Sequence, residues 1–242
     1  MNIKNLIKKI LFFFGLSIQK RSVLNDRDLQ LISTLNYLSI DLLLDVGANV
    51  GQFAEVVRKE GYKGKIVSIE PLSKAHNILK KKSQKDSNWN VCERTAIGAI
   101  DGIIEINISE NSVSSSILPI LEAHTRAEKS SQYISSEKVR IQKLDAISDS
   151  FIEKNSKLFI KIDTQGYEWD VLMGGEKTLR IAKGVLLELS LVNLYQGQAL
   201  YDQILDFMKK NNFSLWAVLP NFTNQLNGQM LQIDAIFVNN TL

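Results

Sequence analysis

The fold of this protein is decided by the segment Leu42-Leu-Leu-Asp-Val-Gly-Ala-Asn-Val-Gly-Gln-Phe-Ala54. Residues 42–46 are a short apolar run broken only by Asp45, which is typical of a strand buried on both faces of a parallel sheet. Gly47 and Gly51 follow, and from Phe53 onward the apolar spacing becomes helical. Small residues in such a turn let a ligand approach the backbone, and the free N–H groups of the helix start face that ligand. The segment therefore predicts the first turn of a nucleotide-binding βαβ unit.

The turn lacks the residues that cradle phosphate groups. Counted from Gly47, a dinucleotide fingerprint needs glycine where this chain has Asn49 and Gln52, and no Lys-Ser/Thr pair of a P-loop follows. The next predicted strand, residues 65–69, ends at Glu70, whose carboxylate is placed to accept hydrogen bonds from both hydroxyls of a ribose. The pattern therefore predicts ribose binding by Glu70 and gives little support to a phosphate site.

Two motifs together resemble a known enzyme family. The first is an Asp-x-Gly-x-x-x-Gly pattern that starts at Asp45 and is followed by an acid after the second strand, which resembles the class I S-adenosylmethionine-dependent methyltransferases. The second is Lys161-Ile-Asp-Thr-Gln-Gly-Tyr-Glu-Trp-Asp-Val-Leu-Met-Gly174, which resembles the Lys-Ile-Asp-x-x-Gly-x-Glu-x-x-x-Leu-x-Gly signature of the FkbM-type methyltransferases. The resemblance extends over about residues 42–238.

The resemblance implies that the chain binds S-adenosylmethionine and methylates an oxygen atom, often a hydroxyl of a sugar or natural product in this family. The expected cofactor-binding residues are Asp45, Gly47, Asn49, Gly51, Phe53, Glu70, Pro71, Ala96 and Asp163. A general base that takes the hydroxyl proton is expected among Asp163, Glu168 and Glu188. Many family members carry an acid where this chain has Gln165, so any role of that acid does not transfer.

The order of the predicted elements indicates a Rossmann-like α/β fold, in which a mostly parallel seven-stranded sheet carries helices on both faces. Strands are expected at residues 42–46, 65–69, 89–94, 158–162, 185–189, 213–218 and 231–238. The last two would form the antiparallel hairpin that closes the sheet. Because ligands bind at the carboxyl ends of the strands in such sheets, Asp45, Glu70 and Asp163 are predicted to converge on one crevice.

The middle of the chain is predicted to form a β-hairpin and two polar loops. The turn Asp101-Gly102 lies between the apolar residues 97–100 and the alternating residues 103–108, so these two segments are expected to pair. The serine-rich segments 109–116 and 130–136 are expected to be loops that line the acceptor side of the site or act as a lid.

Histidine and cysteine are too scarce for a metal site. The two histidines and the single cysteine, Cys92, match no spacing of metal ligands. We interpret His76 and His124 as surface residues, with a general-base role of His124 as the alternative. Lys161 is unusual inside a buried strand, and we expect it to face the sheet edge or to pair with an acid. A single cysteine excludes an intramolecular disulfide and fits a cytoplasmic location.

Composition and charge indicate one globular domain behind a basic arm. The chain has 242 residues, of which 45% are hydrophobic and 23% charged, and its formal net charge is +3. Residues 1–21 carry five basic residues and no acid, so residues 22–242 carry −2. A domain with this charge lacks the basic field of a nucleic-acid-binding protein. We therefore expect a methyltransferase domain over residues 22–242 that acts on a small molecule or glycan and not on nucleic acid.

Two other functions stay open as alternatives. RNA or protein methylation is disfavoured by the charge of the domain. It is also disfavoured because Asp163-Thr-Gln-Gly stands where an Asn/Asp-Pro-Pro-Tyr/Phe motif would follow the fourth strand. A noncatalytic module would use the same fold as a binding surface, but the presence of Asp45, Gly47, Gly51 and Glu70 argues against it.

The arm, residues 1–21, allows two interpretations. Its apolar stretch, residues 10–16, is far shorter than the roughly 20 residues that span a bilayer. A basic start before an apolar stretch resembles a signal peptide, but no Ala-x-Ala-like cleavage site follows. As a helix, the arm would carry apolar residues on one side and lysines elsewhere. It is therefore expected either to contact the inner membrane surface peripherally or to pack on its own domain or on the second subunit of a homodimer.

Overall fold

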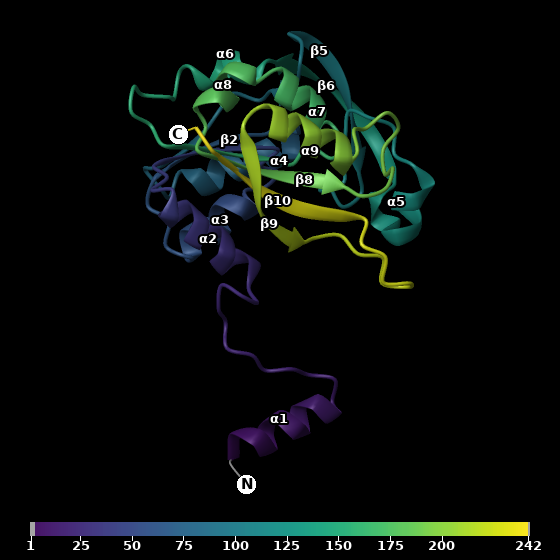
Figure 1. Cartoon of the computed structure of the whole chain (residues 1–242). Coiled ribbons are helices and arrows are strands. Elements are labelled where there is room, and N and C mark those ends of the chain that lie inside the picture. Colours follow the sequence, from purple (N-terminus) through teal and green to yellow (C-terminus); the bar gives the residue numbers. More distant parts are fainter. Residues whose placement is uncertain (1–2, 242) are drawn as a thin grey trace.

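The computed structural model describes residues 3–241, and within this range seven strands form one sheet (Figure 1). Their spatial order is β3 (Trp89–Val91), β2 (Lys65–Ile69), β1 (Leu42–Val46), β7 (Leu158–Ile162), β8 (Gly184–Ser190), β10 (Gln232–Asn239) and β9 (Phe213–Pro220). The first five strands are parallel, and β10 is antiparallel to both β8 and β9. The predicted parallel sheet with an antiparallel closing hairpin is confirmed.

Helices cover both faces of the sheet because both faces are apolar. They are α2 (Arg27–Tyr37), α3 (Gln52–Lys59), α4 (Ser73–Ser83), α6 (Leu144–Ser148), α7 (Glu168–Met173), α8 (Glu176–Ile181) and α9 (Tyr201–Lys210). Leu42, Leu44 and Val46 of β1 belong to one core cluster, together with residues of α7, α8 and α9. Leu43 belongs to the opposite cluster, together with residues of α2 and α3. Because side chains alternate along β1, the two faces of this strand pack into the two core clusters on opposite sides of the sheet.

The direction in which the chain crosses the sheet reverses between β1 and β7. Starting at β1, the chain proceeds to β2 and β3 on one side and then returns to β7 and β8 on the other side. The crossovers diverge at such a point, and a crevice opens outside the carboxyl ends of the two strands. The two motifs that start at Asp45 and Lys161 both lie at this edge.

A second sheet replaces the predicted hairpin. Its order is β4 (Ala96–Ile97), β6 (Tyr133–Gln142) and β5 (Gly102–Ser109), with β5 antiparallel and β4 parallel to β6. The predicted pairing of residues 97–100 with 103–108 is therefore wrong. The Asp101 carboxylate accepts a hydrogen bond from the Lys143 backbone N–H, which ties the predicted turn to the end of β6. Residues 102–109 pair with the long strand β6 in place of the short hairpin with residues 97–100.

The segment 130–136, expected as a loop, enters the same sheet. After α5 (Glu122–Ala127) and the 3₁₀ helix η1 (Lys129–Ser131), the strand β6 begins at Tyr133. Ser135 and Ser136 pair with Ile108 and Asn107 of β5 and are exposed to solvent. The polarity of these two serines therefore reflects the exposed face of a strand and does not indicate a loop.

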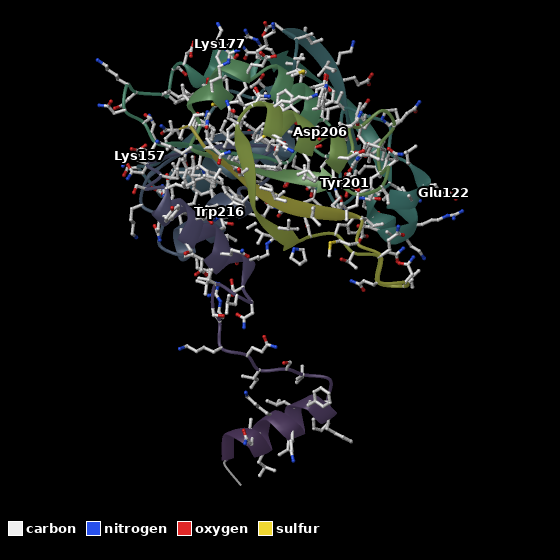
Figure 2. The ribbon with its side chains drawn as sticks, viewed as in Figure 1. Glu122, Lys157, Lys177, Tyr201, Asp206 and Trp216 are labelled. Carbon is white, nitrogen blue, oxygen red and sulfur yellow. The ribbon has the colours of Figure 1, made fainter. Side chains whose placement is uncertain are left out.

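The helix α1 (Ile3–Phe13) stands away from the domain (Figure 1). Its side chains extend into open space (Figure 2), and the side chains of Phe12 and Phe13 are 79% and 85% exposed. The chain rejoins the domain at Arg21, which pairs with Asp26 and Glu60. In this structure the arm therefore does not pack on its own domain, whereas packing on a second subunit and peripheral membrane contact stay predictions. Among residues 3–241, no helix has the length and apolarity needed to cross a bilayer.

Candidate active site

A cavity of about 560 Å³ opens at the carboxyl ends of the parallel strands. This volume lies within the range of small-molecule and cofactor sites. Most of the residues expected from the sequence line it, namely Gly47, Asn49, Phe53, Glu70, Pro71, Ala96, Asp163 and Glu188. Three others, Asp45, Gly51 and Glu168, are buried behind its wall.

The turn after β1 depends on two glycines. Gly47 has φ +75°, and a Cβ atom there would come within 1.9 Å of the backbone oxygen of Asp163. Gly51 has φ +90°, and its Cβ would come within 2.8 Å of the Trp89 ring. Both positions therefore combine a left-handed backbone with a close neighbour, which only glycine accommodates. The turn brings β1 against the end of β7 without a side chain between them.

Glu70 holds the loops on either side of it. Its Oε2 atom accepts a hydrogen bond of 2.7 Å from the backbone N–H of Asn49, and its Oε1 atom accepts one of 2.7 Å from the N–H of Leu72. Burial raises the pKa of this carboxyl to about 7. Each oxygen keeps a second lone pair that ribose hydroxyls can approach, since Glu70 lines the cavity.

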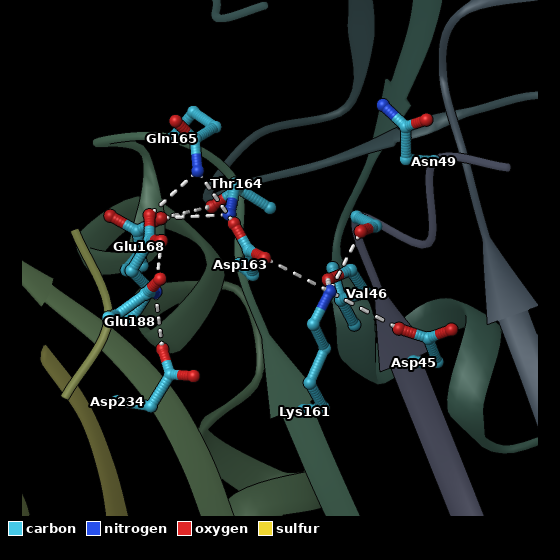
Figure 3. A network of polar contacts seen from close by, with 12 residues as sticks. Asp45, Val46, Asn49, Lys161, Asp163, Thr164, Gln165, Glu168, Glu188 and Asp234 are labelled. Atoms are coloured by element: carbon cyan, nitrogen blue, oxygen red, sulfur yellow. Dashed lines mark hydrogen bonds and ion pairs between the residues drawn. The ribbon is translucent and has the colours of Figure 1, made fainter. Parts of the chain in front are cut away.

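Lys161 joins the two motifs (Figure 3). Its Nζ atom donates a hydrogen bond of 2.8 Å to the carbonyl oxygen of Gly47, and it lies 3.3 Å from Asp45 Oδ1 and 3.5 Å from Asp163 Oδ2. Burial opposes its charge, but Asp163 and Asp45 outweigh burial and raise the pKa of the lysine. The prediction that Lys161 pairs with an acid is confirmed. Asp45 itself is fully buried, and its other carboxylate oxygen accepts a hydrogen bond of 3.1 Å from the Ser68 hydroxyl.

Asp163 and Glu188 lie together on the other side of the cavity, bridged by one amide (Figure 3). The Nε2 atom of Gln165 donates to Asp163 Oδ1 at 2.9 Å and to Glu188 Oε2 at 2.7 Å. Burial and the negative charge of Asp163 raise the pKa of Glu188 well above its ordinary value. The side chain of Asp163 is 36% exposed, so it is the more accessible of the two carboxylates.

Gln165 is held in place from two further sides. Its backbone has φ +54°, and its carbonyl oxygen accepts a hydrogen bond of 2.6 Å from the Ser116 hydroxyl. Its side-chain oxygen accepts a hydrogen bond of 2.8 Å from the Tyr195 hydroxyl. The amide nitrogen is thereby directed toward the two carboxylates. Toward the two carboxylates, Gln165 therefore acts as a hydrogen-bond donor, which an ionised acid at this position could not do.

Glu168 organises the loop instead of facing the cavity. Its Oε1 atom accepts hydrogen bonds from the backbone N–H groups of Thr164 at 2.8 Å and Gly166 at 3.2 Å. Burial raises its pKa to about 7. Because all of these contacts point into the loop 164–166, the structure places Glu168 among the residues that support the site.

Sequence reasoning missed the partners of Glu188 on the closing hairpin. Gln232 Nε2 donates to Glu188 Oε2 at 2.7 Å, and Asn221 Nδ2 donates to Glu188 Oε1 at 2.9 Å and to Asp234 Oδ1 at 2.9 Å. Asp234 also pairs with Arg27 at the start of α2. Gln232 and Asp234 are two residues apart in a strand whose next four residues are apolar, so their position on one face of that strand could have indicated a polar cluster.

Both histidines are buried, which corrects the expectation that they lie on the surface. The His76 ring nitrogen Nε2 lies 2.8 Å from the carbonyl oxygen of Cys92. His124 lines the cavity and packs against Tyr195 and Phe222, with ring centroids 5.2 and 5.3 Å away. Burial lowers the pKa of His124 to about 4, so it is neutral at neutral pH. Within residues 3–241 no cluster of three or more potential metal ligands is present.

Comparisons with solved structures return methyltransferases at low similarity. The crystal structure of methyltransferase FkbM from Methylobacillus flagellatus KT is 13% identical with a TM-score of 0.46, and the match covers 81% of this chain and 43% of that one. The chain thus spans less than half the length of that protein. Magnesium protoporphyrin IX methyltransferase from Synechocystis PCC 6803, solved with bound SAM, is 11% identical with a TM-score of 0.44, covering 99% and 98%. No curated protein matches the chain.

A family model gives the more specific result. The model described as Methyltransferase FkbM domain matches residues 45–215, which include the turn after β1, the end of β2 and the whole motif from Lys161 to Gly174. The matched segment is more than half of the chain, and its two motifs meet in one cavity through Lys161 and Gly47. The chain therefore belongs to the FkbM methyltransferase family.

Proposed function

We propose that the protein transfers the methyl group of S-adenosylmethionine to a hydroxyl oxygen of a small molecule or glycan. The observation that carries this proposal is the arrangement of a single cavity, with Glu70 at the end of β2 on one side and the Asp163–Glu188 pair on the other. The side with Glu70 carries an acceptor for the ribose hydroxyls of a nucleoside. The side with Asp163 and Glu188 carries carboxylates that can bind a hydroxyl group and take its proton.

The residues of the first side fit S-adenosylmethionine. Gly47 and the left-handed Asn49 both line the cavity, and each oxygen of Glu70 keeps a second lone pair for a ribose hydroxyl. Ala96 and Ile97 supply an apolar wall suited to an adenine ring. The described lining includes six acidic residues, Asp28, Glu70, Glu128, Asp163, Glu188 and Asp234, but only two permanently basic ones, Arg27 and Lys161. Even when Glu70 and Glu188, whose pKa values are raised, are protonated, the acids outnumber the bases, which favours a cationic sulfonium and disfavours a phosphate backbone as acceptor.

Bound S-adenosylmethionine supplies a methyl group on a good leaving group, so the protein mainly has to position an acceptor oxygen behind that methyl. In this proposal the reacting hydroxyl donates its hydrogen bond to Glu188, and Asp163, the more accessible carboxylate, accepts one from a neighbouring hydroxyl of the same acceptor. Glu188 takes this proton at Oε1, to which Asn221 is the one donor among residues 3–241. The raised pKa of Glu188 makes it the stronger base of the pair, and a general base contributes about 10²- to 10⁴-fold in rate.

The acceptor side also suits a molecule with several hydroxyl groups. Gln232 and Asn221 present amides, Asp163 and Asp234 present carboxylates, and all four line the cavity. A sugar hydroxyl both donates and accepts, so such a mixed lining can satisfy neighbouring hydroxyls of one ring. This complementarity supports a sugar or glycan as the acceptor.

Calorimetric titration of the purified protein with S-adenosylmethionine tests the proposal, with NAD as the control nucleotide. We expect micromolar binding of S-adenosylmethionine only, and at least about tenfold weaker binding in Glu70→Ala, because the ribose loses its acceptor. Glu153→Ala, which changes an exposed acid outside the cavity, is the matched control and should leave the affinity unchanged. Absence of binding, or equal binding of NAD, would refute the cofactor assignment.

Methyl transfer is then measured with radiolabelled cofactor against sugars, glycans, RNA and protein. Label on a sugar or glycan hydroxyl is the expected result. Label on RNA or protein alone would replace the proposed acceptor while keeping the cofactor. Cofactor binding with no transfer to any of these classes would favour the noncatalytic alternative.

A further inference from the structure

We propose that residues 3–21 bind the surface of an anionic phospholipid bilayer. The helix α1 and the segment that follows it project from the domain (Figures 1 and 2), and most of the apolar side chains described in residues 6–18 are exposed. This binding does not depend on methyl transfer, so the two proposals can fail independently.

The arm exposes a concentrated apolar surface. The exposed large apolar side chains within it are Leu6, Ile7, Ile10, Phe12, Phe13, Phe14, Leu16 and Ile18. Soluble monomers rarely leave a contiguous apolar surface of this kind uncovered. Three consecutive phenylalanines at the end of α1 supply bulky rings that insert at the boundary between headgroups and acyl chains. The stretch is too short to span the bilayer, so its fitting location is the interface.

The charge of the arm selects the partner. Residues 1–21 contain five basic residues and no acid, and Lys8, Lys9 and Lys20 form no ion pair with any described residue. Anionic headgroups attract such a segment, and the attraction adds to apolar insertion. A second copy of the arm would bring like charges together. Charge complementarity therefore favours an anionic bilayer over a homodimer.

The arm joins the domain beside the cavity. Arg21 is held by Asp26 and Glu60, and Arg27, six residues later, lines the cavity. Only residues 14–20 separate α1 from this anchor, and seven extended residues reach at most about 25 Å. A bound arm would thus keep the cavity close to the bilayer. If the proposed function holds, an acceptor anchored in the membrane would be presented to the site.

Sedimentation of the full chain with vesicles tests this inference. One set of vesicles contains phosphatidylcholine alone, and the other contains phosphatidylcholine with an equal part of phosphatidylglycerol. We expect at least about tenfold more protein bound to the anionic vesicles, with binding weakened by high salt because exposed charges are screened. The triple variant Phe12→Ser/Phe13→Ser/Phe14→Ser and the double variant Lys8→Glu/Lys9→Glu should each lose about tenfold or more in bound fraction.

The control is Leu226→Ser, which removes an exposed leucine from a loop of the domain and should bind as the unchanged chain does. The circular dichroism spectrum and denaturation midpoint of every variant should match those of the unchanged chain, which shows that the domain is folded whether or not it binds a cofactor. The inference is overturned if neither vesicle type binds protein, or if the arm variants bind as well as the control. Light scattering supplies a further test. The inference is also overturned if the unchanged chain is a dimer that binds no vesicles and the phenylalanine variant is a monomer, because a second copy is then the partner of the arm.

Discussion

The Nζ atom of Lys161 donates a 2.8 Å hydrogen bond to the carbonyl oxygen of Gly47. This contact links the two motifs of the family across 114 positions of the chain. The hydrogen bond fixes the turn after β1 to β7, and the negative charges of Asp45 and Asp163 compensate the positive charge of the lysine. A cation buried in the sheet is thus part of the scaffold of the proposed cofactor site.

Replacement of Lys161 by methionine should destabilise the protein by about 3–5 kcal/mol, because the buried Asp45 loses its partner. Chemical denaturation measures this change. The double variant Lys161→Met/Asp45→Asn should recover part of the loss, since no uncompensated charge stays buried. If the two variants are equally unstable, the pairing with Asp45 does not carry the effect.

Gly47→Ala should abolish cofactor binding and lower stability, because the new Cβ would meet the Asp163 carbonyl at 1.9 Å. Gly228 is the matched control, since it has φ +74° and a Cβ atom there would meet nothing within 4 Å. Gly228→Ala should cost only the backbone strain, about 1 kcal/mol, with unchanged cofactor affinity. Similar losses in both variants would show that backbone strain, not the contact with Asp163, sets the requirement for glycine.

Glu188→Gln should lower kcat by about 10²- to 10⁴-fold with little change in cofactor affinity, because the amide cannot take the acceptor proton. In the unchanged enzyme, the base must be deprotonated, and burial raises its pKa. Activity should therefore rise with pH through a value above the ordinary pKa of glutamate. The pH profiles of kcat for both proteins check this, and retention of the same rise in Glu188→Gln would assign it to another group.

Glu168 should make the folded protein less stable as the pH rises from about 4.5 to about 7. Its pKa is about 7 in the folded state against an ordinary value of 4.5, so the folded state binds more protons in this window and the free energy of unfolding falls. The full effect is about 3 kcal/mol. Glu168→Gln should reduce the slope of the stability profile in this window, measured by denaturation at each pH, while Glu70 keeps its own contribution because its pKa is also about 7. An unchanged slope would show that Glu168 does not titrate there.

Local patterns sufficed to locate the cavity-lining residues at the ends of strands. The positions of Gly47, Glu70 and Asp163 follow from the change between strand and helix spacing, and all three line the cavity. The role of Glu168 did not follow, because a carboxylate in a first helical turn can face either the ligand or its own loop. Its hydrogen bonds to the loop 164–166 decided the matter.

Pairing between distant segments was the weaker part of the sequence argument. The local turn at Asp101 predicted a hairpin, yet Ile103 of β5 pairs with Arg140 of β6, more than 30 positions away. His124 has polar neighbours in sequence, but its ring is buried by Tyr195 and Phe222 from other parts of the chain. Burial and strand partners are properties of the packed molecule, and single-segment patterns do not contain them.

The sequence by itself determined the family, the mostly parallel sheet and the position of Glu70, the proposed ribose acceptor, because these depend on short motifs and on apolar periodicity. Only the tertiary structure decided that Gln165 bridges Asp163 and Glu188 and that Gln232 of β10 completes the cluster. The reason is physical: the hydrogen bond between Glu188 and Gln232 forms between residues 44 positions apart, and it exists only once β10 has inserted beside β8.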